Sequence, residues 1–300
     1  MEKQFDVIII GGSYSGLAAG MALGRALRNV LIIDAGDPCN KQTPHSHNFL
    51  TNDGKPPKEI ASLAKQQVSA YGTVSFLKGF VTNGINTKNG FEVQTETGET
   101  FSSRKLIFAT GIKDIMPDIP GFAESWGISV LHCPYCHGYE VHHQKTGILA
   151  NGDAGYELSS LISNWTNDLT LYTNGKSTLS DDQRAKLGKH KISIEEAEID
   201  SLENESGYIR NIVFKSGIKA NIKALYAKLP FVQHSCIPQT FGCEFTQEGY
   251  IKVDPAQKTS VHGVYACGDN TTKMRTVANA VSMGTTTALM VNKELIEEDF

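Results

Sequence analysis

The amino-terminal part of the chain alternates apolar runs with small and polar residues in the order strand, turn, helix, strand. An apolar run from Phe5 to Ile10 leads into Gly11-Gly12-Ser13-Tyr14-Ser15-Gly16, and an Ala-, Leu- and Gly-rich helical stretch continues to Leu27. A second apolar run, Val30 to Ile33, ends at Asp34. This order predicts a βαβ unit of the dinucleotide-binding type.

The turn of this unit has the chemistry that a pyrophosphate needs. Its small residues allow close backbone approach, and the helix N-terminus stabilises negative charge. Asp34 stands where a carboxylate accepts hydrogen bonds from ribose hydroxyls. Ser13 occupies the middle glycine position of the usual pattern, and the alternative is a plain tight turn that packs a helix on a sheet. The candidate cofactor-binding residues here are Gly11, Gly12, Ser13, Ser15, Gly16 and Asp34.

A second unit of the same kind is predicted in the middle of the chain. An apolar run from Gly147 to Ala150 turns through Asn151 to Gly155, and a helical stretch reaches about Trp165 before the strand Leu169 to Tyr172. Two such units indicate two nucleotide-type domains with a catalytic junction between them. Because Ala150 stands where a glycine is expected, a pseudo-Rossmann domain that binds no nucleotide is the alternative.

Near the C-terminus, Gly263 to Asp269 is predicted as a strand that ends in Gly-Asp, followed by a helix from about Thr276 to Glu297. Gly268 permits close backbone approach, and Asp269 can bond a polyol chain. The alternative is a plain turn, where Gly-Asp after a strand is also common. The helix N-terminus, at Thr276, Val277 and Ala278, can stabilise negative charge that develops on a reduced ring.

Composition changes this α/β picture little. The 300 residues are 40% hydrophobic and 20% charged, with a formal net charge of -4, which fits a globular chain of two domains and gives no basic surface for nucleic acid. The first apolar run is too short for a membrane span and has no signal-peptide cleavage pattern. We therefore expect a cytoplasmic protein.

The most informative stretch is His132-Cys133-Pro134-Tyr135-Cys136-His137-Gly138. Six cysteines in such a chain do not form a disulfide framework, so a close Cys-x-x-Cys pair in a reducing compartment is catalytic or metal-binding. Cys133 and Cys136 can close a small disulfide, and His137 can move the proton that a leaving thiolate needs. The alternative for His137 is a surface imidazole.

Zinc is the alternative for the cysteine pair, with His132, His137, His142 and His143 as further ligands. A structural zinc site usually has a second Cys-x-x-Cys or a spaced histidine pair, and the remaining cysteines supply neither. We favour the disulfide and expect buried free thiols at Cys39, Cys236, Cys243 and Cys267.

Over nearly its whole length the chain resembles the low-molecular-weight thioredoxin reductase family. Besides the turns and the cysteine pair, the matching motifs are Ala109-Thr110-Gly111, Ile119-Pro120-Gly121, Trp126-Gly127, Gly249-Tyr250-Ile251-Lys252-Val253 and Gly263 to Asp269. The resemblance implies two Rossmann-like domains, the second inserted into the first: an FAD domain (1–113 and 233–300) and a nicotinamide-type domain (114–232). It also implies a homodimer, cofactor contacts at Ala109, Thr110 and Gly111, a flavin-facing Cys136 and a substrate-exchanging Cys133.

Two motifs depart from that family. His137 stands where an aspartate acid is usual, and Cys-Pro-Tyr-Cys-His-Gly-Tyr-Glu looks like the branch with dithiol oxidases of gliotoxin and holomycin biosynthesis. Thr173-Asn174-Gly175 replaces the His-Arg-Arg that grips the NADPH phosphate, so we expect NADPH to be a poor donor with no strong preference over NADH. The alternative is that Lys176 and Arg184 move in and restore the phosphate site.

We therefore expect an FAD-dependent disulfide oxidoreductase that exchanges electrons between flavin and Cys133/Cys136 and then with a protein or small-molecule disulfide. The alternatives are a dithiol oxidase that uses oxygen and a flavin-binding redox sensor without turnover.

Overall fold

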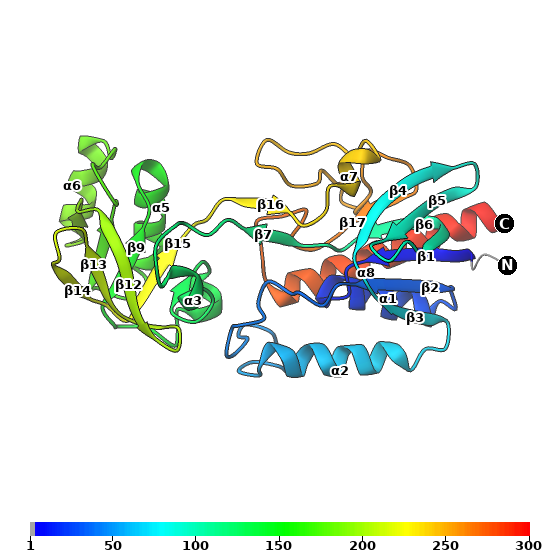
Figure 1. The fold of residues 1–300 in the computed structure, drawn as a ribbon, viewed down its shortest axis with the longest axis horizontal. Helices are drawn as coiled ribbons and strands as arrows, with labels where there is room; N and C mark the ends of the chain where they lie inside the picture. The colour runs from blue at the N-terminus through cyan, green and yellow to red at the C-terminus, as the bar shows by residue number, and fades with distance from the viewer. Residues whose placement is uncertain (1–3) are drawn as a thin grey trace. The chain divides into compact units, whose positions relative to one another are not determined.

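The computed structural model describes residues 4–300, which divide into two compact units. Unit 1 comprises residues 4–41, 48–113 and 231–300, and unit 2 comprises residues 42–47 and 114–230. The α/β class expected from the sequence is confirmed, with a mainly parallel sheet in each unit (Figure 1). Among residues 4–300, no helix combines the length and apolarity needed to cross a membrane.

Unit 1 is built on a seven-stranded sheet. Its path is β3-β2-β1-β6-β5-β4, and β17 also pairs with β6. The strands β1, β2, β3, β6 and β17 run parallel, whereas β4 and β5 are antiparallel. Their bounds are β1 Gln4–Ile10, β2 Val30–Asp34, β3 Val74–Lys78, β4 Val81–Thr87, β5 Gly90–Thr95, β6 Thr100–Phe108 and β17 Val264–Ala266.

Both faces of this sheet are covered, which explains why β1 is apolar at successive positions. Val7 and Ile9 point into a core shared with the helices α1, α2 and α8, while Ile8 and Ile10 point into a second core that includes α7. The helices are α1 Tyr14–Arg25, α2 Pro57–Ser69, α7 Ile237–Thr240 and α8 Val277–Asp299.

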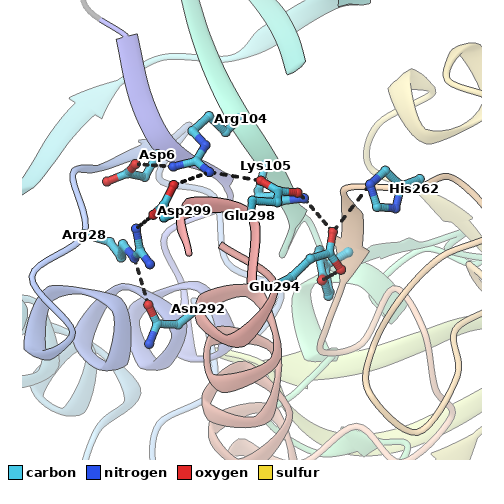
Figure 2. A network of polar contacts seen from close by, with 10 residues as sticks. Asp6, Arg28, Arg104, Lys105, His262, Asn292, Glu294, Glu298 and Asp299 are labelled. Carbon is cyan, nitrogen blue, oxygen red and sulfur yellow. Dashed lines mark hydrogen bonds and ion pairs between the residues drawn. The ribbon is translucent and has the colours of Figure 1, made fainter. Parts of the chain in front are cut away.

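Ion pairs hold the C-terminal end of α8 against the sheet of unit 1. Lys105 on β6 is buried, and its Nζ donates to Glu294 at 2.5 Å and also to Glu298 (Figure 2). Lys258 and the Tyr265 hydroxyl each reach the other Glu294 oxygen at 2.6 Å. Burial acts to raise the pKa of Glu294, but these hydrogen bonds outweigh it and lower the pKa to about 2.

Unit 2 contains a five-stranded parallel sheet in the order β11-β10-β9-β15-β8 and a three-stranded antiparallel sheet, β12-β13-β14. The strand, helix, strand order expected around residues 147–172 is present as β9, α5 and β10. The bounds are α3 Phe122–Ser125, β8 Val130–Leu131, α4 Pro134–His137, β9 Thr146–Leu149, α5 Gly152–Ile162, β10 Leu169–Tyr172, α6 Asp181–Lys189, β11 Ser193–Glu195, β12 Ile199–Glu205, β13 Tyr208–Phe214, β14 Lys219–Asn221 and β15 Ala224–Ala227. The paired strands β7 (Ile112–Asp114) and β16 (Phe231–Gln233) carry the chain out of unit 1 and back.

Candidate functional site

In unit 1, the parallel strands β1, β2, β6 and β17 end at one edge of the sheet, and the candidate cofactor residues follow those ends. The turn after β1 touches the segment after β6: a Cβ added to Gly11 would lie 2.2 Å from the Ala109 carbonyl oxygen. A Cβ on Gly16 would lie 1.9 Å from the Gly11 carbonyl oxygen. Gly11 and Gly16 are therefore needed for the turn to close against α1.

Asp34 lies at the end of β2, beside this turn. We call the turn of residues 11–16 together with Asp34 the cradle. Asp34 Oδ1 accepts a hydrogen bond from the Gly12 amide at 3.0 Å, so the carboxylate is fixed beside the turn. The first amides of α1 have no carbonyl partner within the helix and are available to a negatively charged group. This is the arrangement that the sequence pattern predicts for a pyrophosphate and a ribose.

The segment after β17 closes on the same turn. Gly268, at φ +89°, lies so near Ser15 that a Cβ would come within 2.6 Å of its hydroxyl. Gly284 of α8 likewise approaches the Ser15 carbonyl, which a Cβ would meet at 2.1 Å. Asp269 lies 3.7 Å from Arg275. Thr276 caps α8 by accepting from the Asn279 amide at 3.2 Å, so Val277 and Ala278 form the first turn of that helix.

Asn270 is a candidate cofactor residue that the sequence patterns did not indicate, although it follows Gly268-Asp269 directly. Its side chain is fully buried, and Nδ2 donates to the Phe108 carbonyl at 2.9 Å and to the Thr110 hydroxyl at 3.3 Å. Within residues 4–300 its Oδ1 has no hydrogen-bond partner. A buried amide oxygen without a partner is rare in proteins, and here it indicates a position where a bound group donates a hydrogen bond.

In unit 2, Cys133 and Cys136 form a disulfide with a Cα–Cα distance of 5.4 Å, which confirms the expected pairing. Cys133 is the N-cap of the short helix α4, and Pro134 begins it. Gly138 ends the helix, and its missing side chain makes room for Trp165, which a Cβ would meet at 2.8 Å. The sulfur pair therefore lies on a turn whose backbone is packed against an indole.

His137 follows Cys136 at the end of α4 and is half-buried. Burial, and secondly the charge of nearby His47, lower the pKa of His137 to about 4. The imidazole is thus held neutral at pH 7, which is the form that accepts a proton.

The expectation of four buried free thiols is wrong for two of them. Cys243 and Cys267 are buried, but Cys39 and Cys236 are exposed. Cys39 lies in the loop after β2, and Cys236 precedes α7, whose Ile237 takes the buried position. An apolar preference of cysteine does not decide burial in a loop or at a helix end, where neighbouring residues supply the core contacts.

Unit 2 lacks a ready site for the phosphate of NADPH. The Thr173 hydroxyl donates to the Gly175 carbonyl at 2.6 Å, and Asn174 Oδ1 accepts from the Ile199 amide at 2.7 Å. The nearest arginine, Arg184, pairs with Glu196 at 2.9 Å. Thr173, Asn174 and Arg184 are thus engaged within the unit, whereas Lys176 is exposed in this loop. One flexible ammonium replaces a bidentate guanidinium poorly.

Asn151 caps the N-terminus of α5. Asn151 Oδ1 accepts from the amides of Gly152 and Thr178 at 2.8 and 2.9 Å, and its Nδ2 donates to the Lys176 carbonyl at 3.0 Å. This side chain ties the loop after β10 to the first turn of α5. Residues 173–175 therefore present no cation to a 2'-phosphate, and Asn151 occupies the first amide of α5.

One group of carboxylates and imidazole in residues 4–300 has the spacing of metal ligands: His262, Glu294 and Glu298, with ligand atoms within 4.8 Å of one another. Both lysines described above, Lys105 and Lys258, already neutralise Glu294. A cation at this place would meet two ammonium groups, so the geometry is that of an ion-pair network.

Comparison with known proteins decides the family. The family model described as pyridine nucleotide-disulphide oxidoreductase matches residues 5–284. The chain belongs to this family. Among curated relatives, the thioredoxin reductase tcpT of Claviceps purpurea is 32% identical over 98% of this chain and 95% of its own.

Solved structures of this family give the same result. The oxidoreductase from Agrobacterium tumefaciens is 34% identical with a TM-score of 0.92, covering 98% of this chain and 99% of its own. HlmI is 32% identical with a TM-score of 0.94, covering 100% of this chain and 95% of its own. This pyridine nucleotide-disulphide oxidoreductase is a thioredoxin reductase-like, FAD-dependent disulfide oxidoreductase that acts through the Cys133/Cys136 pair.

Proposed function

We propose that this enzyme works as a dithiol oxidase: a dithiol gives two electrons to the Cys133/Cys136 disulfide, and they leave through FAD to molecular oxygen. The observation that carries the direction is the closed loop of unit 2, where Asn151, Thr173 and Asn174 engage the groups that a nicotinamide donor would need. A donor other than the pyridine nucleotide is then required, and the dithiol itself supplies the electrons.

FAD is assigned to the unit 1 cradle. The turn Gly11, Gly12, Ser13, Ser15 and Gly16 would hold the pyrophosphate and Asp34 the adenosine ribose. On the flavin side, we assign Ala109, Thr110, Gly111, Gly268 and Asp269, together with Thr276, Val277 and Ala278 at the start of α8. The Asn270 oxygen described above supports a bound group beside Thr110. When bound, FAD supplies the two-electron acceptor for the sulfur pair.

The protein's own residues perform the sulfur chemistry. A substrate thiolate attacks Cys133 Sγ, the bond to Cys136 breaks, and the electron pair goes to Cys136 Sγ. His137 passes to the leaving Cys136 thiolate the proton that the substrate thiol gave up. The second substrate thiol then attacks the substrate sulfur of the mixed disulfide and releases Cys133. The products are a substrate disulfide and two reduced cysteines, and the protons of the two substrate thiols end on the cysteines.

The experiment compares two directions of electron flow in one preparation of the enzyme: from a dithiol to oxygen, and from NADPH or NADH to the flavin. With dithiothreitol and air, we expect continuous oxygen uptake and one hydrogen peroxide formed per disulfide. Under anaerobic conditions, micromolar NADPH and NADH should bleach the flavin slowly and about equally. Fast, saturable bleaching by NADPH, much better than by NADH, would contradict the proposal and establish the second candidate, a reductase of the kind that the relative's name describes.

We also propose a cytoplasmic homodimer. The compartment is supported by the small share of disulfides: within residues 4–300, one disulfide forms although the chain has six cysteines, as a reducing environment favours. Light scattering at working concentration should give twice the chain mass of 32.7 kDa, and a monomer would reject the dimer.

A further inference from the structure

An ion pair between Arg184 of α6 and Glu196, which directly follows β11, lies beside the loop after β10 in unit 2. Arg184 Nη2 lies 2.9 Å from Glu196 Oε1, and the same nitrogen donates to the Ser177 carbonyl at 3.4 Å. The side chains of Arg184 and Glu196 are 37% and 43% exposed, so the pair lies at the surface of the unit. The guanidinium is thus fixed between this loop and the end of β11.

The strands of unit 2 place Glu196 next to the loop after β10. β10 and β11 are parallel neighbours with Tyr172 opposite Glu195, so both strands end at the same edge of the sheet. The Gly175 amide donates to the Glu196 carbonyl at 3.0 Å. Together with the Arg184 contact, this bond holds the Glu196 carboxylate beside the loop.

The Glu196 carboxylate engages donors of the kind that bind phosphate. Its pKa is lowered, first by the hydrogen bond from Arg184, and further by a hydrogen bond with the Ser177 backbone and by the charges of Arg184 and Lys176. Guanidinium groups and loop amides are common phosphate donors in proteins. Glu196 is therefore ionised at pH 7 and acts as an internal anion at this place.

The position of this anion matters because of the βαβ unit formed by β9, α5 and β10. In a dinucleotide-binding unit, the end of the second strand meets the adenosine ribose, where a carboxylate suits a free 2'-hydroxyl and an arginine suits a 2'-phosphate. Both kinds of side chain stand beside the end of β10, but Arg184 is already paired with Glu196. A 2'-phosphate would have to displace the carboxylate and would meet its charge.

We propose that Glu196 sets the nucleotide selectivity of unit 2, because it withholds Arg184 from a 2'-phosphate and repels that group. The inference rests on the proposed function, in which NADPH is a poor donor, and names the residue that excludes its extra phosphate. Asn151 caps α5 whichever nucleotide approaches, whereas Glu196 acts against the 2'-phosphate alone.

The test measures binding of adenosine 2',5'-bisphosphate and adenosine 5'-monophosphate by isothermal titration calorimetry. The enzyme is loaded with FAD, so that adenosine cannot enter the cradle of unit 1. In the unaltered protein, the 2'-phosphate should give no gain in affinity. Glu196→Gln should bind the bisphosphate about 10-fold more tightly than the unaltered protein does, because Arg184 is released for a charge-assisted hydrogen bond, and should bind the monophosphate as before. The pair is exposed, so its loss should cost little stability.

Two further variants separate the release of Arg184 from a change in surface charge. Glu198→Gln removes another exposed carboxylate, which pairs with Lys215 at 2.5 Å, and should alter neither affinity. Adding Arg184→Ala to Glu196→Gln should abolish the gain.

Three results would overturn the role of Glu196: an equal gain in Glu198→Gln, a gain that survives Arg184→Ala, or no measurable binding of the bisphosphate by Glu196→Gln. Tighter binding of the bisphosphate than of the monophosphate by the unaltered protein would also contradict it. Absence of oxygen uptake with dithiothreitol would instead refute the proposed function and would leave these affinities unaffected.

Discussion

At the residue scale, the two cysteines have different positions on α4. Cys133 caps the helix and Cys136 lies within it, followed by His137. The proposed function assigns exchange with substrate to Cys133. Each Ser variant should therefore lose dithiol turnover, but they should differ in the covalent adduct that they form.

We expect Cys136→Ser to accumulate a stable mixed disulfide on Cys133 with glutathione disulfide, because no second sulfur resolves it. Cys133→Ser should accumulate much less, and both variants should keep FAD, since the assigned cradle lies in unit 1. Intact mass and flavin absorbance measure the two effects. A stable adduct on Cys136 alone would exchange the two assignments.

His137 gives a pH prediction for stability. Its pKa falls from the usual 6.5 to about 4 in the folded protein because of burial and His47. Between these values the unfolded chain binds a proton that the folded chain does not, so stability is lost as pH falls from about 6.5 to 4, at up to roughly 1 kcal/mol per pH unit. His137→Gln should flatten this slope in urea unfolding at several pH values. An unchanged slope would show that the imidazole is not buried as described.

At the scale of elements, the packing of α1 on the first turn depends on Gly16. An added methyl group would lie 1.9 Å from the Gly11 carbonyl oxygen, which is backbone and cannot rotate away. Gly16→Ala should displace the turn, cost about 1 to 3 kcal/mol of stability and release most of the flavin. Flavin content after gel filtration is the measurement.

Gly188→Ala is the matched control for Gly16→Ala. Gly188 lies in α6 with no atom within 4 Å of an added Cβ. This change should keep the flavin and stabilise the helix by about 0.5 to 1 kcal/mol. Equal flavin retention by both variants would disprove the steric argument.

The buried ion pairs of α8 make a second prediction for an element. Glu294→Gln leaves Lys105 buried with a weaker partner, which should lower stability by about 3 to 5 kcal/mol at pH 7. Because the pKa of Glu294 is lowered to about 2, its contribution is complete above about pH 4.5 and fades as pH falls toward 2. Denaturant titrations at pH 7 and between about pH 4.5 and 2 measure this contribution. The control is Glu297→Gln, which removes the charge from an exposed ion pair on α8 and should change the stability little.

Local patterns predicted the elements that depend on local chemistry. The glycine turn, Asp34 and the Cys-x-x-Cys pair were found because each is defined by neighbouring residue types. The helix after Gly155 was placed to about Trp165 but ends at Ile162, and α1 ends at Arg25 before Leu27. The ends of helices depend on capping and tertiary contacts, which the periodic pattern does not contain.

At the scale of the whole molecule, the features that the sequence did not predict come from contacts between distant segments. Asn270 bonds to Phe108 and Thr110, Asn151 ties down a loop about 25 residues later, and residues 42–47 bring His47 to Glu140. Thr110, Asn151 and Glu140 stand in motifs quoted above, but those motifs do not show which distant side chains meet them. Their roles follow from topology, because the inserted segments determine which side chains meet.

The discontinuity of unit 1 also bears on how the chain folds during synthesis. The central sheet of unit 1 needs β17 and α8, which follow residue 230, whereas unit 2 draws nearly all its residues from 114–230. On the ribosome, unit 2 can therefore complete its core first. Until α8 is synthesised, the apolar face of β1, β2 and β6 that this helix covers stays exposed. Nascent chains stalled after about residue 265 should protect unit 2 from protease and leave residues before 113 cleavable. Flavin would then be acquired late, and the earlier period is when chaperones matter most to this protein.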